Sequence, residues 1–200
     1  MTRSKKLIAV LLACVFVLGM VGCDQTGDAN AAISAANTKS EKYTALDDEM
    51  SVLLDDASAV SMTPEGVQPG IEALDEAAAK YAERKVVIGE IKAEFEKIAS
   101  YKVSEEIKTY ASQQVEIAGL LAQMDDLGIK LIVDTKTFYE LVKAGATSTT
   151  DEAMDADAAK AEELSAAIEE TSAKLTELDT LVTEKETASD TYFTDQGLGE

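Results

Sequence analysis

Apolar residues recur along most of the chain at alternating spacings of three and four residues, the period of an amphipathic helix. The pattern predicts four long helices, over residues 28–60, 70–100, about 104–142 and 150–193. In the third helix the alternation continues without a slip, and sustained heptads favour coiled-coil-like packing. Short connections make neighbouring helices antiparallel, so we expect an all-α fold, an elongated antiparallel bundle of about four long helices.

Turn-forming residues are concentrated between these helices. Both prolines lie in residues 61–70, and a cluster rich in Gly and Thr occupies residues 144–150. The join at residues 100–104 contains neither Gly nor Pro, so the pattern leaves open whether residues 71–143 form one kinked helix or two. Residues 125–128, followed by several β-branched residues, could also break the third helix.

The ends of the helices carry further signals. Asp28 is a candidate N-cap for the first helix, and Thr149 with Glu152 has the spacing of a capping box for the fourth. Residues 194–200 contain two glycines and no periodicity. We therefore expect a helical bundle over residues 29–193 and a flexible tail over residues 194–200.

The N-terminal segment follows a different pattern. Arg3, Lys5 and Lys6 precede a run of 16 uncharged residues, positions 7–22. This run is shorter than the roughly 20 residues that a helix needs to span a bilayer. A basic start and a short apolar stretch ending in small residues are typical of a secretory signal peptide, here residues 1–22.

Four residues close this segment: Met20, Val21, Gly22 and Cys23. They resemble the lipobox of prokaryotic lipoproteins, with Met20 where the family usually has Leu. The resemblance covers the signal segment only. It implies cleavage after Gly22, a diacylglyceryl group on Cys23 and often a further acyl chain, such as palmitate, on the new amine. Asp24, directly after the cysteine, resembles the inner-membrane retention signal of enteric-type envelopes.

Two alternatives to this interpretation remain. Residues 11–14 also fit the lipobox pattern, but cleavage before Cys14 would leave a short apolar region and a strongly apolar mature start, so we prefer Cys23. The segment could instead be an uncleaved signal anchor or an ordinary cleaved signal. Because Cys14 and Cys23 are the only cysteines, a chain cleaved after Gly22 has no thiol except the anchor and no disulfide.

The charge balance narrows the choice of partners. The chain has 38 acidic and 18 basic residues and a net charge of −20; without residues 1–22, 15 basic residues remain and the charge is −23. Nucleic acid is excluded, because its binding needs a basic surface. Anionic headgroups repel such a chain, so we expect it to stand off the membrane on residues 23–28, the lipidated cysteine and a short tether with a reach of roughly 17 Å.

The sequence contains few residues of the types that enzymes use for catalysis. The chain has no histidine, no thiol beyond the signal segment and anchor, and no Gly-rich phosphate-binding loop. We therefore expect no enzyme, no catalytic residue, no cofactor and no dedicated metal site. Paired aspartates at positions 47–48, 55–56 and 125–126 leave weak binding of divalent cations open, whereas residues 155–166 lack the oxygen ligands and Gly of an EF-hand.

Each predicted helix has an apolar face at heptad spacing, called its seam. Polar or small residues interrupt these seams at a few positions. Arg84 and Gln114 occupy seam positions, where a polar residue fixes register or partner choice. Arg84 could alternatively extend to a neighbouring glutamate or bind an anionic ligand. Gly119 and Gly128 would permit a close helix approach or a kink.

Together these features predict a protein on the extracytoplasmic side of the cell membrane. We expect a lipid-anchored, non-catalytic envelope scaffold, spacer or protein-interaction module, with membrane lipid and an envelope protein as partners. The alternative is a ligand- or divalent-cation-binding accessory lipoprotein of a transporter or sensor.

Overall fold

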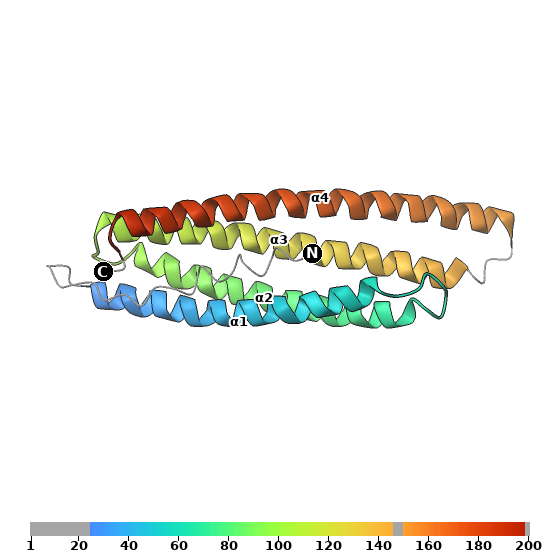
Figure 1. The fold of residues 1–200 in the computed structure, drawn as a ribbon, viewed down its shortest axis with the longest axis horizontal. Coiled ribbons are helices and arrows are strands. Elements are labelled where there is room, and N and C mark those ends of the chain that lie inside the picture. Colours follow the sequence, from blue (N-terminus) through green and yellow to red (C-terminus); the bar gives the residue numbers. More distant parts are fainter. Residues whose placement is uncertain (1–24, 146–149, 199–200) are drawn as a thin grey trace. The chain divides into compact units, whose positions relative to one another are not determined.

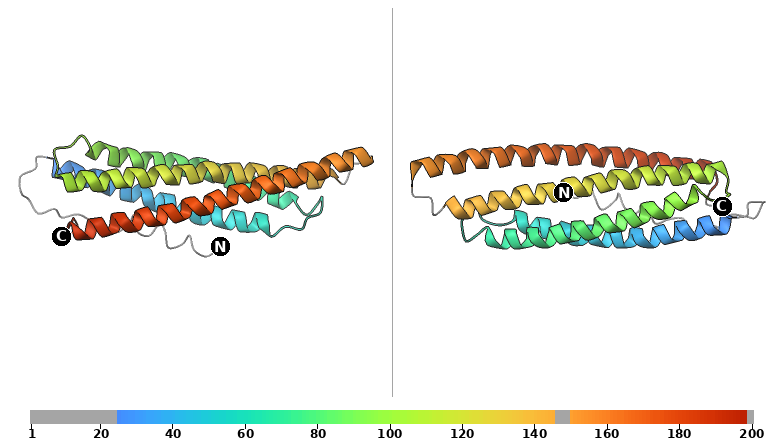
Figure 2. Two further views of the ribbon diagram at one scale, coloured as in Figure 1. Left: turned by 90° about the horizontal axis from the view of Figure 1, so that it is seen from above. Right: turned by 180° about the vertical axis from the view of Figure 1, so that it is seen from behind.

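The computed structural model describes residues 25–145 and 150–198. This part of the chain forms four α-helices and contains no strand (Figure 1). The predicted all-α bundle is therefore confirmed. Consecutive helices run antiparallel (Figure 2). The helices are α1, Thr26–Ser58; α2, Gln68–Ile98; α3, Glu105–Gly145; and α4, Asp151–Asp195.

The question left open for residues 71–143 is answered by a turn between α2 and α3. The amides of Ser100 and Tyr101 donate to the carbonyls of Lys97 and Ile98, at 3.0 and 3.1 Å. This turn needs no glycine with a positive φ. The helix α3 then continues unbroken through residues 125–128, so the β-branched residues that follow do not end it.

Tertiary contacts divide the chain into two units, and every helix contributes one half to each unit. The first unit comprises the residues up to Ala45, Arg84–Gln123 and the residues from Leu178 onward. The second unit comprises Leu46–Glu83 and Met124–Glu177.

The core of the first unit combines aromatic and small side chains. The Tyr110 ring of α3 contacts Phe95 of α2 edge-on, with centroids 6.2 Å apart, and Phe193 of α4, with centroids 5.2 Å apart. The inner face of α1 is lined by small buried residues, which permit close helix approach. These residues are Ala29, Ala32, Ala36 and Ser40.

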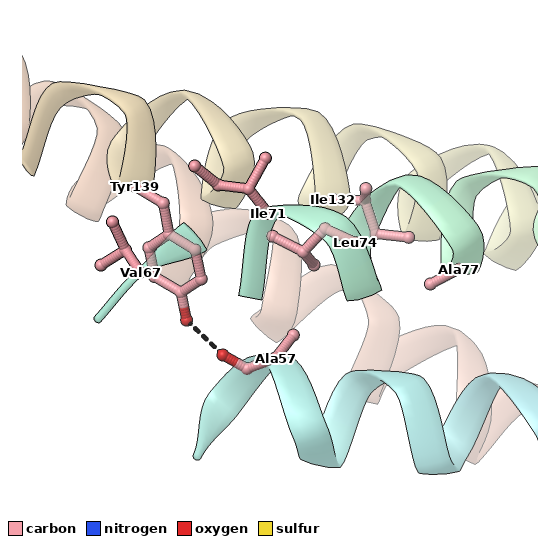
Figure 3. Packing of buried hydrophobic residues seen from close by; sticks show 7 residues of the cluster. All are labelled: Ala57, Val67, Ile71, Leu74, Ala77, Ile132 and Tyr139. Atoms are coloured by element: carbon pink, nitrogen blue, oxygen red, sulfur yellow. Dashed lines mark hydrogen bonds between the residues drawn. The ribbon is translucent and has the colours of Figure 1, made fainter. Parts of the chain in front are cut away.

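The second unit has a compact apolar cluster drawn from α1, α2, α3 and the connection between α1 and α2 (Figure 3). Its buried members are Ala57, Val67, Ile71, Leu74, Ala77, Ile132 and Tyr139. None of them comes from α4. Within residues 152–177 of α4, only Leu164 and Thr171 are buried.

Tyr139 ties α3 to the end of α1. Its hydroxyl donates to the carbonyl oxygen of Ala57 at 2.8 Å (Figure 3). Ala57 lies in the last turn of α1, where carbonyl groups have no partner within the helix. Burial raises the pKa of Tyr139 above its ordinary value, which keeps the hydroxyl protonated as a donor.

The helix ends differ from the predicted ones in detail. Asp28 lies in the first turn of α1 rather than at its N-cap. Thr149 lies outside the described residues, and the hydroxyl of Thr150 accepts a hydrogen bond from the Ala153 amide at 3.3 Å. Helix and a turn continue where the sequence predicted a flexible tail. Gly197, with φ 62°, and the buried Leu198 close α4, because their amides donate to carbonyls of its last turn.

Candidate functional site

The residues of the predicted anchor, Gly22, Cys23 and Asp24, lie outside the described residues. The helix α1 begins at Thr26, within the stretch that the sequence assigns to the tether. The side-chain oxygen of Gln25 accepts a hydrogen bond from the Lys102 amide at 2.7 Å. The start of α1 is therefore fixed to the turn between α2 and α3.

A shallow surface groove of about 350 Å³ lies beside the first turns of α1. Three alanines of α1 line it together with charged and phenolic side chains. The side chain of Lys97 contacts that of Glu94 beside this groove. The lining residues are Asp28, Ala31, Ala32, Ala35, Glu94, Lys97 and Tyr101.

Arg84 is buried in the first unit, where it packs against an aromatic ring. Its guanidinium carbon lies 4.9 Å from the centroid of the Tyr43 ring, and the whole residue is 6% exposed. A cation over an aromatic face stabilises by up to about 2 kcal/mol when it is shielded from water. This contact joins α2 to α1 and favours the interpretation of Arg84 as a residue that sets helix register.

Gln114 joins α3 to α4 through a buried hydrogen bond. Its side-chain nitrogen donates to the hydroxyl of Ser189 at 2.9 Å. Both side chains are nearly inaccessible, at 5% and 0% exposed. The Gln114 carbonyl Oε1 is also buried, and no donor to it is found in the described part of the chain.

The inner face of α4 carries two further polar residues that were not predicted from the sequence. Glu186 and Ser189 are both buried. They follow Val182 at spacings of four and three, so the spacing of the seam contains the signal. The polar character of the two side chains concealed it.

Glu186 has the most strongly perturbed ionisation among the shifts that are resolved. Burial, together with the negative charges of Asp190 and Asp179, raises the pKa of its carboxyl group from 4.5 to about 7. Burial also raises the pKa of Asp190. The inner face of α4 therefore carries a carboxyl group that is partly protonated near neutral pH.

The two glycines predicted to permit close approach behave differently. A Cβ atom at Gly128 would lie 2.3 Å from the Tyr81 ring, so α3 approaches α2 closely at this position. At Gly119 a Cβ atom would meet nothing within 4 Å. Of these two glycines, Gly128 is therefore the one that packing requires.

Ion pairs between helices lie on the surface of each unit. In the first unit, Lys185 pairs with Glu116 at 2.8 Å. In the second unit, Lys136 pairs with Asp75 at 2.5 Å. Solvent screens exposed pairs of this kind, so they adjust helix pairing more than they determine it.

Within residues 25–145 and 150–198, no three carboxylate, thiol or imidazole groups are arranged to hold a metal ion. Over the same ranges, no helix combines the length and apolar character needed to cross a bilayer.

The fold and these contacts define an acidic protein whose residues 25–145 and 150–198 form four antiparallel helices. No protein-family model matches the chain, and neither the curated proteins nor the solved structures give a match. Any statement about function therefore depends on the residues and contacts described above.

Proposed function

We propose that this protein is a lipid-anchored, extracytoplasmic helical protein that acts as a non-catalytic envelope scaffold, spacer or protein-interaction module. The observation that carries the proposal is the sequence Met20-Val21-Gly22-Cys23 after a basic start and 16 uncharged residues. One acyl chain binds a membrane only marginally, whereas two or more anchor a protein stably. A diacylated Cys23 would hold the helices at the membrane surface.

The position and charge of the helices support this arrangement. The start of α1 at Thr26 leaves only a few residues between it and Cys23, so the acyl group would hold this end of the protein within a short distance of the membrane. After loss of residues 1–22 the net charge is −23. Repulsion from anionic headgroups would keep the helices off the lipid and available to a protein partner.

The side-chain chemistry supports a role without catalysis. The chain has no histidine, and a chain cleaved before Cys23 has no thiol that is not acylated. The remaining groups are carboxylates, hydroxyls and amines. Of these, Glu186 has a pKa near 7, but it lies on the inner face of α4 and lines no described groove.

Crosslinking in native membranes tests the interaction. A short amine-reactive crosslinker is added to intact membranes, and the protein is captured after gentle solubilisation. We expect one envelope protein to be captured in a stoichiometric amount, and to be lost with the Cys23→Ser variant. Capture of the monomer alone, at several crosslinker lengths, would contradict the proposed function.

The groove beside α1 favours one alternative, a ligand- or cation-binding accessory lipoprotein. The carboxylates of Asp28 and Glu94 line this groove and are suitable ligands for hard cations. In this case, millimolar Ca²⁺ should raise the melting temperature by several degrees. A rise no larger than that caused by the same ionic strength of NaCl would reject this alternative.

A further inference from the structure

In the first unit, the inner face of α4 carries a carboxyl group where the helix spacing calls for an apolar residue. Val182, Glu186 and Ser189 follow one another at intervals of four and three, and they are 2%, 8% and 0% exposed. A buried carboxylate is costly unless it is paired with a cation or fully hydrogen-bonded. The question is therefore which groups surround Glu186.

A hydrogen bond and a ring contact show which residues of α2 and α3 lie beside Glu186 along the helix axes. Because α3 and α4 are antiparallel, the Gln114–Ser189 hydrogen bond places Ile117, one turn after Gln114, opposite Glu186, one turn before Ser189. The Phe95–Tyr110 contact, two turns away, places Ile88 of α2 at the same level. Both isoleucines are buried, at 2% and 1% exposed. Apolar side chains therefore lie at the level of Glu186 on α2 and α3.

No positive charge compensates Glu186. In the described residues, no side chain forms a hydrogen bond or ion pair with its carboxyl group. The neighbouring Lys185 extends to Glu116 of α3, at 2.8 Å. The charged groups that act on Glu186 along its own helix are Asp190 and Asp179, and both repel a carboxylate.

The charged groups of α1 and α2 near this level pair with each other. Lys39, next to the buried Ser40 of α1, lies 3.5 Å from Glu90 and 3.8 Å from Glu94, both on α2. Glu41 of α1 is exposed. Arg84 of α2, buried one turn from Ile88, lies over the Tyr43 ring of α1, 4.9 Å from its centroid. None of these cations acts on Glu186, whose ionisation is shifted by burial and by the charges of Asp190 and Asp179.

The amide of Gln114 provides a partner that distinguishes the two protonation states of Glu186. Its nitrogen is bonded to Ser189, whereas its buried oxygen Oε1 has no donor in the described part of the chain. Residues three apart on a helix have Cβ atoms about 5–6 Å apart, so the Glu186 side chain can reach the amide bound to Ser189. A protonated carboxyl group has an O–H donor for Oε1, and an ionised one offers only acceptors.

We propose that Glu186, Gln114 and Ser189 form a proton-dependent latch that holds the C-terminal half of α4 against α3. With Glu186 protonated, its O–H donates to Gln114 Oε1, and the half-helix is docked. With Glu186 ionised, a carboxylate without a cation partner is largely shielded from water, and the half-helix opens more often. This inference does not depend on the lipid anchor.

The direction of the pH dependence follows from the pKa. Burial raises the pKa of Glu186 from 4.5 to about 7 in the folded state, so the folded protein holds this proton more tightly than the unfolded chain. The contribution to stability is fully present below pH 4.5. It declines as the pH rises, and it is lost above about pH 7.

The test compares the full chain with its Glu186→Gln variant. Urea unfolding is measured from pH 4.5 to 8, and amide hydrogen exchange of residues 178–198 at both ends of this range is corrected for the intrinsic rates. We expect the unfolding constant of the unaltered chain to rise at least about tenfold more than that of Glu186→Gln, since one pKa unit corresponds to a tenfold change. The extra exchange should be confined to residues 178–198.

The control is Glu184→Gln, which neutralises an exposed carboxylate two residues away on the same helix. It should retain the pH dependence of the unaltered chain. The same pH dependence in Glu186→Gln and in the unaltered chain would overturn the proposal. If Glu186→Gln does not fold, an NMR titration of the Glu186 carboxyl group in the unaltered chain decides, because a midpoint near 4.5 would equally overturn it.

Discussion

The close packing of the Tyr81 ring explains why residue 128 is a glycine. A Cβ atom there would lie 2.3 Å from the Tyr81 ring, whereas one at Gly119, on the same helix, would meet nothing within 4 Å. We expect Gly128→Ala to destabilise the protein by about 1–3 kcal/mol, because the ring must be displaced. Gly119→Ala is the matched control and should stabilise it by up to about 1 kcal/mol. Equal effects in urea unfolding would contradict this account of the α2–α3 contact.

Tyr139 supplies a hydrogen bond that its packing alone does not replace. We expect Tyr139→Phe to lower the free energy of unfolding by about 1–2 kcal/mol, because the Ala57 carbonyl loses its donor while the ring remains. Tyr192→Phe, at a partly exposed position of α4, should change it by less than about 0.5 kcal/mol. A Tyr139→Phe variant as stable as the Tyr192→Phe control would show that the hydroxyl contributes nothing.

Individual polar residues were predictable where they interrupted an apolar seam. Arg84 and Gln114 stood between apolar neighbours, and both are buried. Glu186 and Ser189 lie at the end of a seam in a strongly acidic helix, where a charged residue normally faces water. They continue the spacing of four and three from Val182, so the spacing places them on the inner face, whereas their polar character favoured a position in water.

At the scale of the helices, the spacing of apolar residues predicted every helix and left the ends uncertain. The turn between α2 and α3 contains no Gly or Pro, so the sequence left open whether these helices were one or two. The end of α4 was missed because Gly197 and Leu198 resemble a tail in composition. Tertiary burial of Leu198 decides that end, and local sequence does not report it.

The N-terminal half of α4 is the least buried helical segment of the second unit. Its residues contribute nothing to the apolar cluster of that unit, and Met154 is 56% exposed. We expect amides of residues 152–163 to exchange hydrogen at least about tenfold faster than those of residues 71–83 of α2, since few buried contacts protect them. Equal protection of both segments in exchange mass spectrometry would contradict this description.

At the scale of the whole molecule, charge and targeting carry more functional information than the fold. The bundle class was predictable, since sustained heptads favour packed helices. The anchor is a prediction from residues 1–24, which the structure does not describe. A four-helix fold serves many functions, so the account of function depends mainly on Cys23.

Acyl labelling tests the central claim most directly. Cells expressing the full chain are fed an alkyne-tagged palmitate, and the protein is captured and examined for label and for membrane fractionation. The account predicts label and membrane association for the unaltered chain and for the control Cys14→Ser. It predicts loss of the label for Cys23→Ser, with the protein in the soluble fraction or retained as uncleaved precursor. Label that persists in Cys23→Ser, or that disappears in Cys14→Ser instead, would contradict anchoring through Cys23.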